Sequence, residues 1–312
     1  MICASATNRK RSRIFKDDTL SAYLMTFPMI IGFFVFTIYP IVWVLRYSVF
    51  EYNGFSHAKF IGIENFVRTF QRTPDFWQAI GNSLILTLGI LVVDTTIALI
   101  FAVLLNSSSK VNSMFRTIFF MPCIISSAII GLIFSILFTS YNGVINNMLL
   151  QTGLIHLPVN WFSEKWHALF VLLVAQIWSS FGITMVYFLM GLQGIPSELY
   201  ECAEIDGANR LQKFFKITLP MLAPIMQIIL MLAIVSGMKM TDLALVLTNG
   251  MPGGKTEVVM TYIFKYFFGG EGGAGANAQF GFASAMSVVT AVIVGIITLL
   301  YLQLTKNMKK IY

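Results

Sequence analysis

Charged side chains are scarce in this sequence. Asp, Glu, Lys and Arg make up only 11% of its 312 residues, whereas 57% are hydrophobic. A water-soluble fold of this length would have too little polar surface to cover its apolar residues. The composition therefore excludes ordinary soluble domains and indicates a protein whose solvent is the lipid bilayer.

Cysteine and histidine are also rare, with three residues of each kind. No two cysteines form a CxxC pair, and no histidine has a second ligand at helical spacing. We therefore expect free thiols and no metal site. The residues concerned are Cys3, Cys123 and Cys202, and His57, His156 and His167.

The sequence contains no clear nucleotide-binding or catalytic motif. Residues Gly253-Gly-Lys-Thr256 resemble the end of a phosphate-binding loop, but Asn249 stands where the motif requires its first glycine. No cluster of His, Asp and Glu gathers at one membrane interface, as a membrane enzyme would need. The net charge of +7 comes from short, scattered basic clusters, which argues against nucleic acid as a partner. We expect neither an ATP site nor catalytic residues in this chain.

Six apolar runs are long enough to cross a bilayer as helices, which need about 20 residues each. The first is too long for a signal peptide core and lacks a cleavage site after it. Pro28, Pro40 and Pro122 are expected to kink or end their helices. The predicted spans are residues 23–50, 82–105, 114–138, 167–191, 221–247 and 281–304.

The distribution of Lys and Arg predicts the orientation of these spans, because basic residues concentrate on the cytoplasmic side. An even number of spans places both termini on one side. We therefore expect a basic cytoplasmic tail (1–20), a six-span domain (21–312), a cytoplasmic loop (192–220) and an extracytoplasmic loop (248–280). Most of the 21 basic residues then lie inside: Arg9, Lys10, Arg11, Arg13, Lys16, Lys110, Arg116, Arg210, Lys213, Lys216, Lys306, Lys309 and Lys310.

The 192–220 loop contains residues that are typical of the start and the end of two helices. Ser197 is a candidate N-cap, and Gly207 can end a first helix of about two turns. Small side chains at Cys202 and Ala203 would let another protein approach closely, with Glu198, Glu201, Glu204 and Asp206 supplying charge nearby. A second, amphipathic helix with Arg210, Lys213 and Lys216 on one stripe would lie on the membrane surface until Pro220. On these grounds alone, a docking element and a generic connector are both open.

The residues Glu201-Cys-Ala, Gly207 and Ile217-x-Leu219-Pro220 resemble the EAA signature of binding-protein-dependent ABC importer permeases, with Cys202 in place of alanine. Residues 247–252 and 279–285 are similar to the carbohydrate-uptake branch. The resemblance implies an all-α, type I importer permease with six spans in a bacterial plasma membrane. It implies four kinds of partner: a second permease, two ATP-binding subunits that hold ATP and Mg, an extracytoplasmic solute-binding protein, and the bilayer. The implied ATPase-coupling residues are Glu198, Glu201, Cys202, Ala203, Asp206, Gly207, Ile217, Leu219 and Pro220.

The same resemblance implies where a sugar would pass, in the fourth and fifth spans. Trp178 and Phe181 beside those positions can either stack on a pyranose or pack between helices. Asp94, Lys239 and Asp242 are ionisable residues within spans, where charge is costly and functional roles are common. Lys239 and Asp242, three residues apart, either neutralise each other or line the pathway. The expected pathway residues are Gln176, Trp178, Ser179, Ser180, Ala233, Ser236, Gly237, Lys239, Met240 and Asp242.

These features predict the permease subunit of an ATP-driven importer for an oligosaccharide or sugar derivative. Two alternatives stay open. A glycerol-phosphate importer would give Lys239 an anion to bind, and an ATP-independent secondary transporter would make the 192–220 loop a mere connector. The absence of a convincing internal repeat disfavours the secondary transporter.

Overall fold

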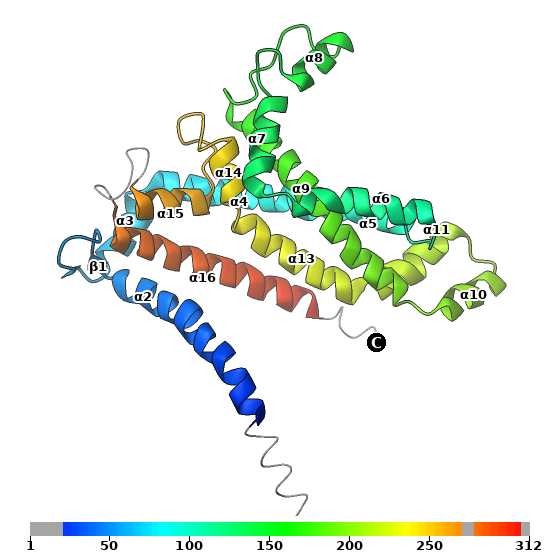
Figure 1. The fold of residues 1–312 in the computed structure, drawn as a ribbon, viewed down its shortest axis with the longest axis horizontal. Coiled ribbons are helices and arrows are strands. Elements are labelled where there is room, and N and C mark those ends of the chain that lie inside the picture. Colours follow the sequence, from blue (N-terminus) through cyan, green and yellow to red (C-terminus); the bar gives the residue numbers. More distant parts are fainter. Residues whose placement is uncertain (1–20, 270–277, 307–312) are drawn as a thin grey trace, which may run out of the picture.

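The computed structural model describes residues 21–269 and 278–306 (Figure 1). The basic tail, part of the predicted extracytoplasmic loop and the last basic residues lie outside this range. The described chain is mostly helical, as predicted. One small antiparallel sheet interrupts it, in which β1 (Phe50–Glu51) pairs with β2 (Lys59–Phe60). By length and composition four helices can cross a membrane, or up to six if each of two bent pairs is one span.

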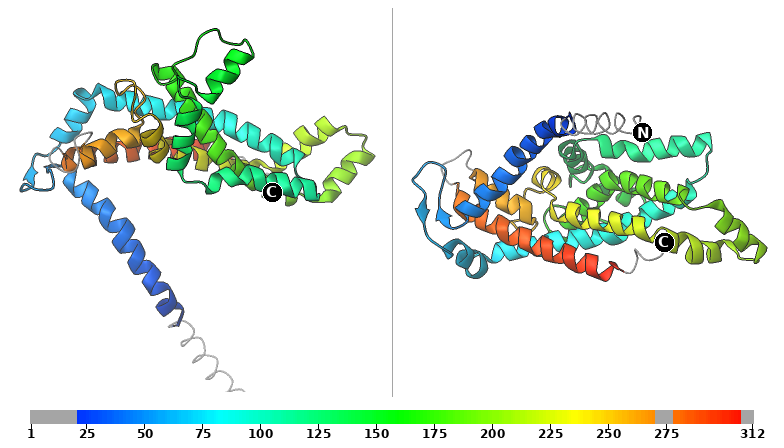
Figure 2. Two further views of the ribbon diagram at one scale, coloured as in Figure 1. Left: turned by 45° about the horizontal axis from the view of Figure 1, so that its top comes forward. Right: turned by 90° about the horizontal axis from the view of Figure 1, so that it is seen from below.

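The first span is a single helix, Ser21–Tyr47. It ends before the predicted boundary at residue 50 because Phe50 belongs to β1. Neither Pro28 nor Pro40 interrupts it. A π-helical turn, η1 (Phe34–Ile38), precedes α2 (Tyr39–Tyr47). Pro40 lies in the first turn of α2 and has no amide hydrogen to donate, and the wider turn before it accommodates this. Only the end of this helix packs on the rest of the chain, and the remainder projects away from the bundle (Figure 2).

The second span begins earlier than predicted, at Pro74 instead of residue 82. It consists of α4 (Pro74–Gly89), the π-helical turn η2 (Ile90–Asp94) and α5 (Thr95–Leu104), and a short helix α3 (Glu64–Gln71) precedes it. Pro74 occupies the first turn, where its fixed φ suits a helix start. The fully buried Phe76 and Ala79 show that this early part already packs inside.

The third span is broken, not continuous over 114–138 as predicted. Helices α6 (Lys110–Phe120) and η3 (Met121–Ile124) meet α7 (Ser127–Leu137) at an angle of 98°. The break follows Pro122, so the predicted kink is confirmed and is sharper than expected. A further helix, α8 (Val144–Gln151), extends sideways from the bundle beyond α7 (Figure 1).

The fourth and sixth spans match their predictions closely, as α9 (Lys165–Gln193) and α16 (Phe280–Leu304). The fifth does not. Helix α13 (Ala223–Met238) stops at Lys239, and α14 (Asp242–Leu247) begins after a three-residue interruption. The prediction of one helix over 221–247 is therefore wrong. Beyond it, α15 (Val259–Phe268) occupies part of the 248–280 loop.

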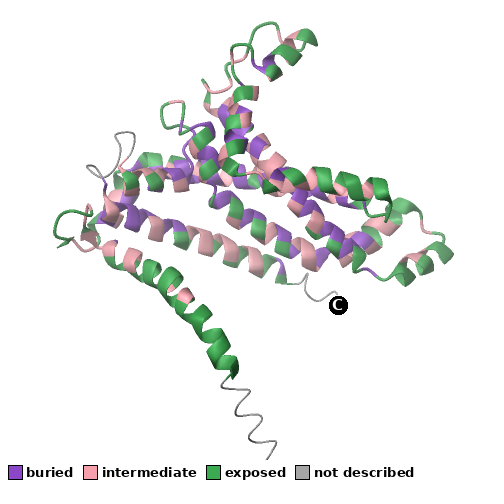
Figure 3. Cartoon of the chain, in the orientation of Figure 1, coloured by how far each residue is buried: buried purple, intermediate pink, exposed green. Residues whose placement is uncertain are grey.

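Buried residues form three clusters along the bundle. The first joins α7, α9 and α14, the second joins α5, α9 and the start of α13, and the third joins α4, α15 and α16. Figure 3 shows these buried stretches in the middle of the molecule, whereas the first helix and the segment around α10 are largely exposed. The core thus fixes the spans and holds the base of the 192–220 segment through Leu192 and Ile195, while most of α10 projects from it.

Candidate functional site

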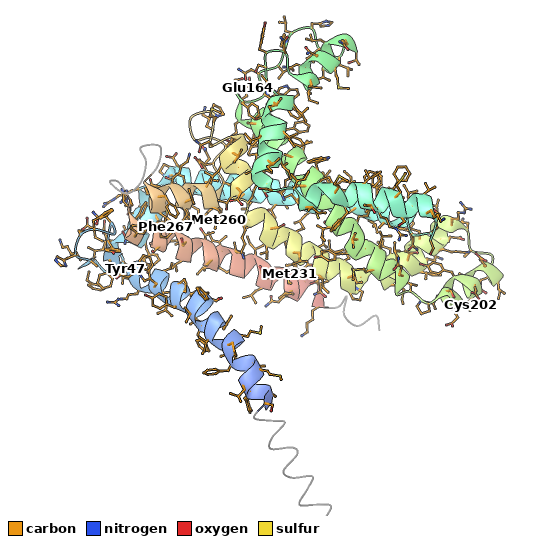
Figure 4. The ribbon with its side chains drawn as sticks, viewed as in Figure 1. Tyr47, Glu164, Cys202, Met231, Met260 and Phe267 are labelled. Atoms are coloured by element: carbon orange, nitrogen blue, oxygen red, sulfur yellow. The ribbon has the colours of Figure 1, made fainter. Side chains whose placement is uncertain are left out.

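The 192–220 segment forms a bent protrusion at one end of the bundle. Helix α10 (Ser197–Ile205) follows α9, and after a bend α11 (Arg210–Lys213), η4 (Phe214–Thr218) and α12 (Leu219–Met221) return to α13. Cys202 lies at the far tip, well away from the spans (Figure 4). The described ends of the first helix and of α16 point toward this same end of the bundle (Figures 1 and 2). Two helices with a bend between them were predicted here.

The start of α10 differs from its prediction, but its end agrees. Pro196 holds the cap position and makes no side-chain cap, so Ser197 is the first helical residue and not the N-cap. Gly207 adopts a φ of +75°. The Ala208 amide donates to the Ala203 carbonyl at 2.8 Å, and the Gly207 amide to the Glu204 carbonyl at 3.0 Å. These two bonds form a Schellman motif, which needs a left-handed residue at this position.

One face of α10 is exposed and carries mixed chemistry. Glu198, Glu201, Cys202 and Ile205 recur at helical spacing, so they share one stripe. All four are exposed, and Ile205 shows 87% of its surface although it is apolar. Within the described residues, Glu201 has no hydrogen bond or ion pair. A carboxylate beside an uncovered apolar side chain suits a protein partner better than water.

The opposite face of α10 contacts the returning segment. The hydroxyls of Tyr200 and Thr218 share a hydrogen bond of 2.9 Å. The Lys213 ammonium donates to the Glu204 carboxylate, and this bond and charge lower the pKa of Glu204 below its ordinary value. Asn209 caps α11 through a reciprocal pair of bonds with Gln212. The sequence contains all of these residues, but no local pattern indicates the two contacts between helices.

The other predicted coupling residues lie within the same protrusion. Ala203 is half-buried on α10, and Asp206 is the exposed residue that ends it. Ile217 falls in η4, and Leu219 and Pro220 begin α12, all three half-buried. The chain bends by 66° between α12 and α13. Pro220 therefore marks the entry to the fifth span, as predicted.

Ser180, a predicted pathway residue, instead contributes to a buried polar contact between two spans. Asp94, which is only 2% exposed, accepts hydrogen bonds from the Ser180 hydroxyl at 3.0 Å and the Thr184 hydroxyl at 2.9 Å. The two hydroxyls are four residues apart on α9, so both face Asp94. This arrangement supports a structural role for Asp94, one of the two roles that the sequence left open.

Several other predicted pathway residues pack inside the bundle. Ala233 and Met240 are buried in one cluster, and Trp178 packs against it with its ring 5.8 Å from that of Phe134. Gly237 faces α4, where an added Cβ would come within 2.5 Å of the Thr87 hydroxyl. Phe181 contacts Phe101 and Phe119. Trp178 and Phe181 are therefore both packed between helices, which is one of the two roles that the sequence left open for them.

The remaining predicted pathway residues are accessible. Gln176 and Ser179 are half-buried on α9, and Ser236 is exposed on α13. Lys239 and Asp242 are both exposed and lie on opposite sides of the helix interruption, with no ion pair between them. Of the two roles that the sequence left open, the arrangement argues against neutralisation on one helix face.

Two polar hollows lie at the end of the bundle opposite α10. The first, of about 770 Å³, includes Tyr52, His57 and Arg68; the second, of about 440 Å³, includes Asp75, Tyr262 and Lys265. Neither is lined by a predicted pathway residue. Near the second, Thr256 of the Gly253-Gly-Lys-Thr256 segment is buried and donates to the Met251 carbonyl. The Thr256 hydroxyl therefore donates its hydrogen bond within the local turn.

The chain is similar over almost its whole length to transporter permeases. It is 35% identical to "Probable ABC transporter permease protein YesP" of Bacillus subtilis, over 93% of this chain and 92% of that protein. It is 32% identical to "Arabinooligosaccharides transport system permease protein AraP" of the same organism, over 95% and 92%. A chain in the crystal structure of "a bacterial ABC transporter involved in the import of the acidic polysaccharide alginate" matches with a TM-score of 0.80 and 25% identity, over 95% of this chain and 99% of that one.

Residues 94–310 match a family model that covers most of the chain, from the middle of the second span through α16. The match includes the protrusion and both broken spans. This chain therefore belongs to the family of binding-protein-dependent transport system inner membrane components.

Proposed function

We propose that this chain is the transmembrane subunit of an ATP-driven importer for an oligosaccharide or sugar derivative, and that α10 is the element on which a separate ATPase docks. The observation that carries the proposal is the protruding helix. Its outer face presents Glu201, Cys202 and Ile205 to solvent, while its end is held by the Schellman motif at Gly207. The family match supports an importer permease and not the ATP-independent transporter that the sequence left open.

In this proposal Glu201 makes a charge-assisted hydrogen bond with a basic side chain of the ATPase, and Ile205 fills an apolar hollow on it. Closure of the ATPase pair on ATP moves α10 as a rigid body, and the attached spans open the pathway to the outside. The other proposed coupling residues, from Glu198 to Pro220, shape this element. ATP and Mg are bound by the partner subunits.

Carbohydrate is the proposed substrate class because several similar proteins carry sugar names. AraP is described as an arabinooligosaccharide permease, and "Lactose transport system permease protein LacF" of Rhizobium radiobacter is 30% identical over 96% of this chain. A second permease would complete the pathway, since the proposed pathway residues Ser236 and Lys239 are exposed in the isolated chain. An extracytoplasmic solute-binding protein would deliver the substrate, and both termini would be cytoplasmic.

The alternative of a phosphorylated polyol has one observation in its favour. Lys239 is exposed and forms no ion pair within the described residues, so it is available to an anion. Binding of a neutral oligosaccharide panel and of glycerol phosphate to the cognate solute-binding protein distinguishes the two. Affinity for glycerol phosphate alone would overturn the carbohydrate assignment.

A detergent pull-down with the tagged chain tests the docking proposal. We expect it to recover a nucleotide-binding subunit. A variant carrying Glu201→Ala and Gly207→Val should insert into the membrane at normal levels and lose uptake. Normal uptake by this double variant would overturn the proposal.

A further inference from the structure

Helix α10 is joined to two spans. The side-chain hydrogen bond and the ion pair that it makes both run toward the fifth span. Toward α9 it is connected by the short turn at residues 194–196, where the Ile195 amide donates to the Leu192 carbonyl. Toward α13, the hydrogen bond between Tyr200 and Thr218 and the ion pair between Glu204 and Lys213 fasten it to the returning segment. A movement of α10 would therefore reach the two spans unequally.

The two contacts lie on one side of α10, away from its exposed stripe. Tyr200 and Glu204 are four residues apart and share a face. At 3.6 residues per turn, this face lies roughly 130° around the helix from the stripe that contains Glu201 and Ile205. A partner that covers the stripe would leave the Tyr200 and Glu204 contacts intact. Force applied to the outer face would thus pass through the helix to these contacts.

The π-helical turn η4 brings the two receiving residues to the same side. Lys213 and Thr218 are five apart, which in an α-helix would separate them by about 140°. Around η4 the Leu219 amide instead bonds to the Phe214 carbonyl, five residues back. Thr218 is 6% exposed, so the contact with Tyr200 is shielded from solvent, whereas the ion pair joins a Lys213 side chain that is 15% exposed to a Glu204 side chain that is 70% exposed. Tyr200 also packs against a cluster that joins Leu222, at the entry to α13, to Leu192 and Ile195 at the end of α9, so the polar contacts and not this packing distinguish the two spans.

We infer that Tyr200, Glu204, Lys213 and Thr218 are positioning residues that fasten α10 to the fifth span, so that α10 and α13 move as one body while α9 turns relative to them. The inference rests on the proposed function, since it needs an ATPase that moves α10. It assigns transmission to the fifth span, which carries Ser236 and leads to Lys239. The turn at 194–196 acts as the hinge.

Distances between spin labels test this directly in the importer reconstituted with its ATPase in nanodiscs. Labels at Leu199→Cys and Leu232→Cys report on α10 relative to α13, and labels at Leu199→Cys and Met190→Cys report on α10 relative to α9. Leu199 lies on neither the exposed stripe nor the contact face. The native thiols are first replaced by Cys3→Ser, Cys123→Ser and Cys202→Ala.

We expect the 199–232 distance to be the same in the nucleotide-free and the vanadate-trapped ATP states, and the 199–190 distance to shift. A shift in the 199–232 distance, or a constant 199–190 distance, would overturn the inference. Glu204→Lys should broaden the 199–232 distribution, and adding Lys213→Glu should narrow it again. Absence of the broadening, or of the recovery, would also count against it.

Tyr200→Phe should broaden the same distribution, whereas Tyr141→Phe, which removes a hydroxyl from a side chain that is 84% exposed between α7 and α8, should not. Co-purification of the ATPase is measured in parallel. If the unmutated chain fails to retain the ATPase, the proposed function is wrong. If the ATPase is retained and the distances behave otherwise, only the present inference is wrong.

Discussion

At the scale of single residues, Gly207 has the clearest physical requirement. Its φ of +75° costs an L-residue roughly 1–2 kcal/mol, and an added Cβ would meet nothing within 4 Å. Any effect of a side chain at this position therefore comes from backbone conformation and not from a clash. Gly153 provides a matched case. It ends α8 with the same pair of bonds, has a φ of +72° and is equally open.

Gly207→Ala should lower uptake while leaving membrane expression unchanged, because relief of the backbone strain would reorient α10. Gly153→Ala carries a similar backbone cost at a site away from α10 and should leave uptake near the unmodified level. Uptake of a labelled oligosaccharide in vesicles measures both. Equal losses in the two variants would indicate a general stability effect and contradict a special role for Gly207.

Asp94 provides a second test at this scale. If it joins α9 to the second span through Ser180 and Thr184, Asp94→Ala should remove two hydrogen bonds to a carboxylate and destabilise the protein by about 1–3 kcal/mol, with the two hydroxyls keeping only their backbone acceptors on α9. Thermal unfolding in detergent measures this. Thr184→Val should be less than additive with Asp94→Ala. Lost uptake with unchanged unfolding would instead make Asp94 a pathway residue.

The sequence predicts some of these residue roles and not others. Gly207 could be assigned to a helix end because glycine at that position is a local signal. The partners of Tyr200 and Glu204 could not, since Thr218 and Lys213 face them only after the chain bends and forms a π-helical turn. Ile205 was missed for another reason. An apolar residue in a polar helix is informative only when its exposure is known.

At the scale of elements, hydropathy located the apolar spans but not their interruptions. The stretch around Ile125 and Ser126 stays largely apolar across a 98° break. The break between α13 and α14 instead contains the polar residues Lys239 and Thr241 and is followed by Asp242. Hydropathy records burial preference and carries no information on chain direction. Pro122 gave a local signal for the first break. No proline marks the second break, but the polar residues Lys239, Thr241 and Asp242 interrupt the apolar run there.

Helix packing gives the prediction at this scale. Gly182 of α9 crosses so close to the end of α6 that an added Cβ would lie 2.1 Å from the Phe119 carbonyl oxygen. Gly182→Ala should therefore destabilise the protein by about 1–3 kcal/mol or more through overpacking. Gly81→Ala in α4, where nothing lies within 4 Å, should be neutral or stabilising by up to about 1 kcal/mol. Thermal unfolding in detergent measures both stabilities. Similar stabilities for the two variants would contradict the close approach of α9 to the Phe119 carbonyl.

At the scale of the whole molecule, the chain exposes more apolar helix surface than its own core can cover. None of the most apolar stretch of the first helix is buried. Lipid or another membrane subunit must cover that surface. The protrusion at α10 is different, because it projects beyond the spans and is largely exposed (Figure 3), with Glu201 and Ile205 on its outer face. That face is the part of the molecule that the proposal assigns to the ATPase.

The most direct test of this assignment is the amount of ATPase that co-purifies with tagged chains carrying Ile205→Asp or Leu157→Asp. Both side chains are apolar and highly exposed, at 87% and 78%, but Ile205 is on α10 whereas Leu157 follows α8. A buried, unpaired carboxylate costs an interface several kcal/mol. We expect Ile205→Asp to lose the ATPase and Leu157→Asp to retain it. Equal recovery of the ATPase with both variants would contradict the account.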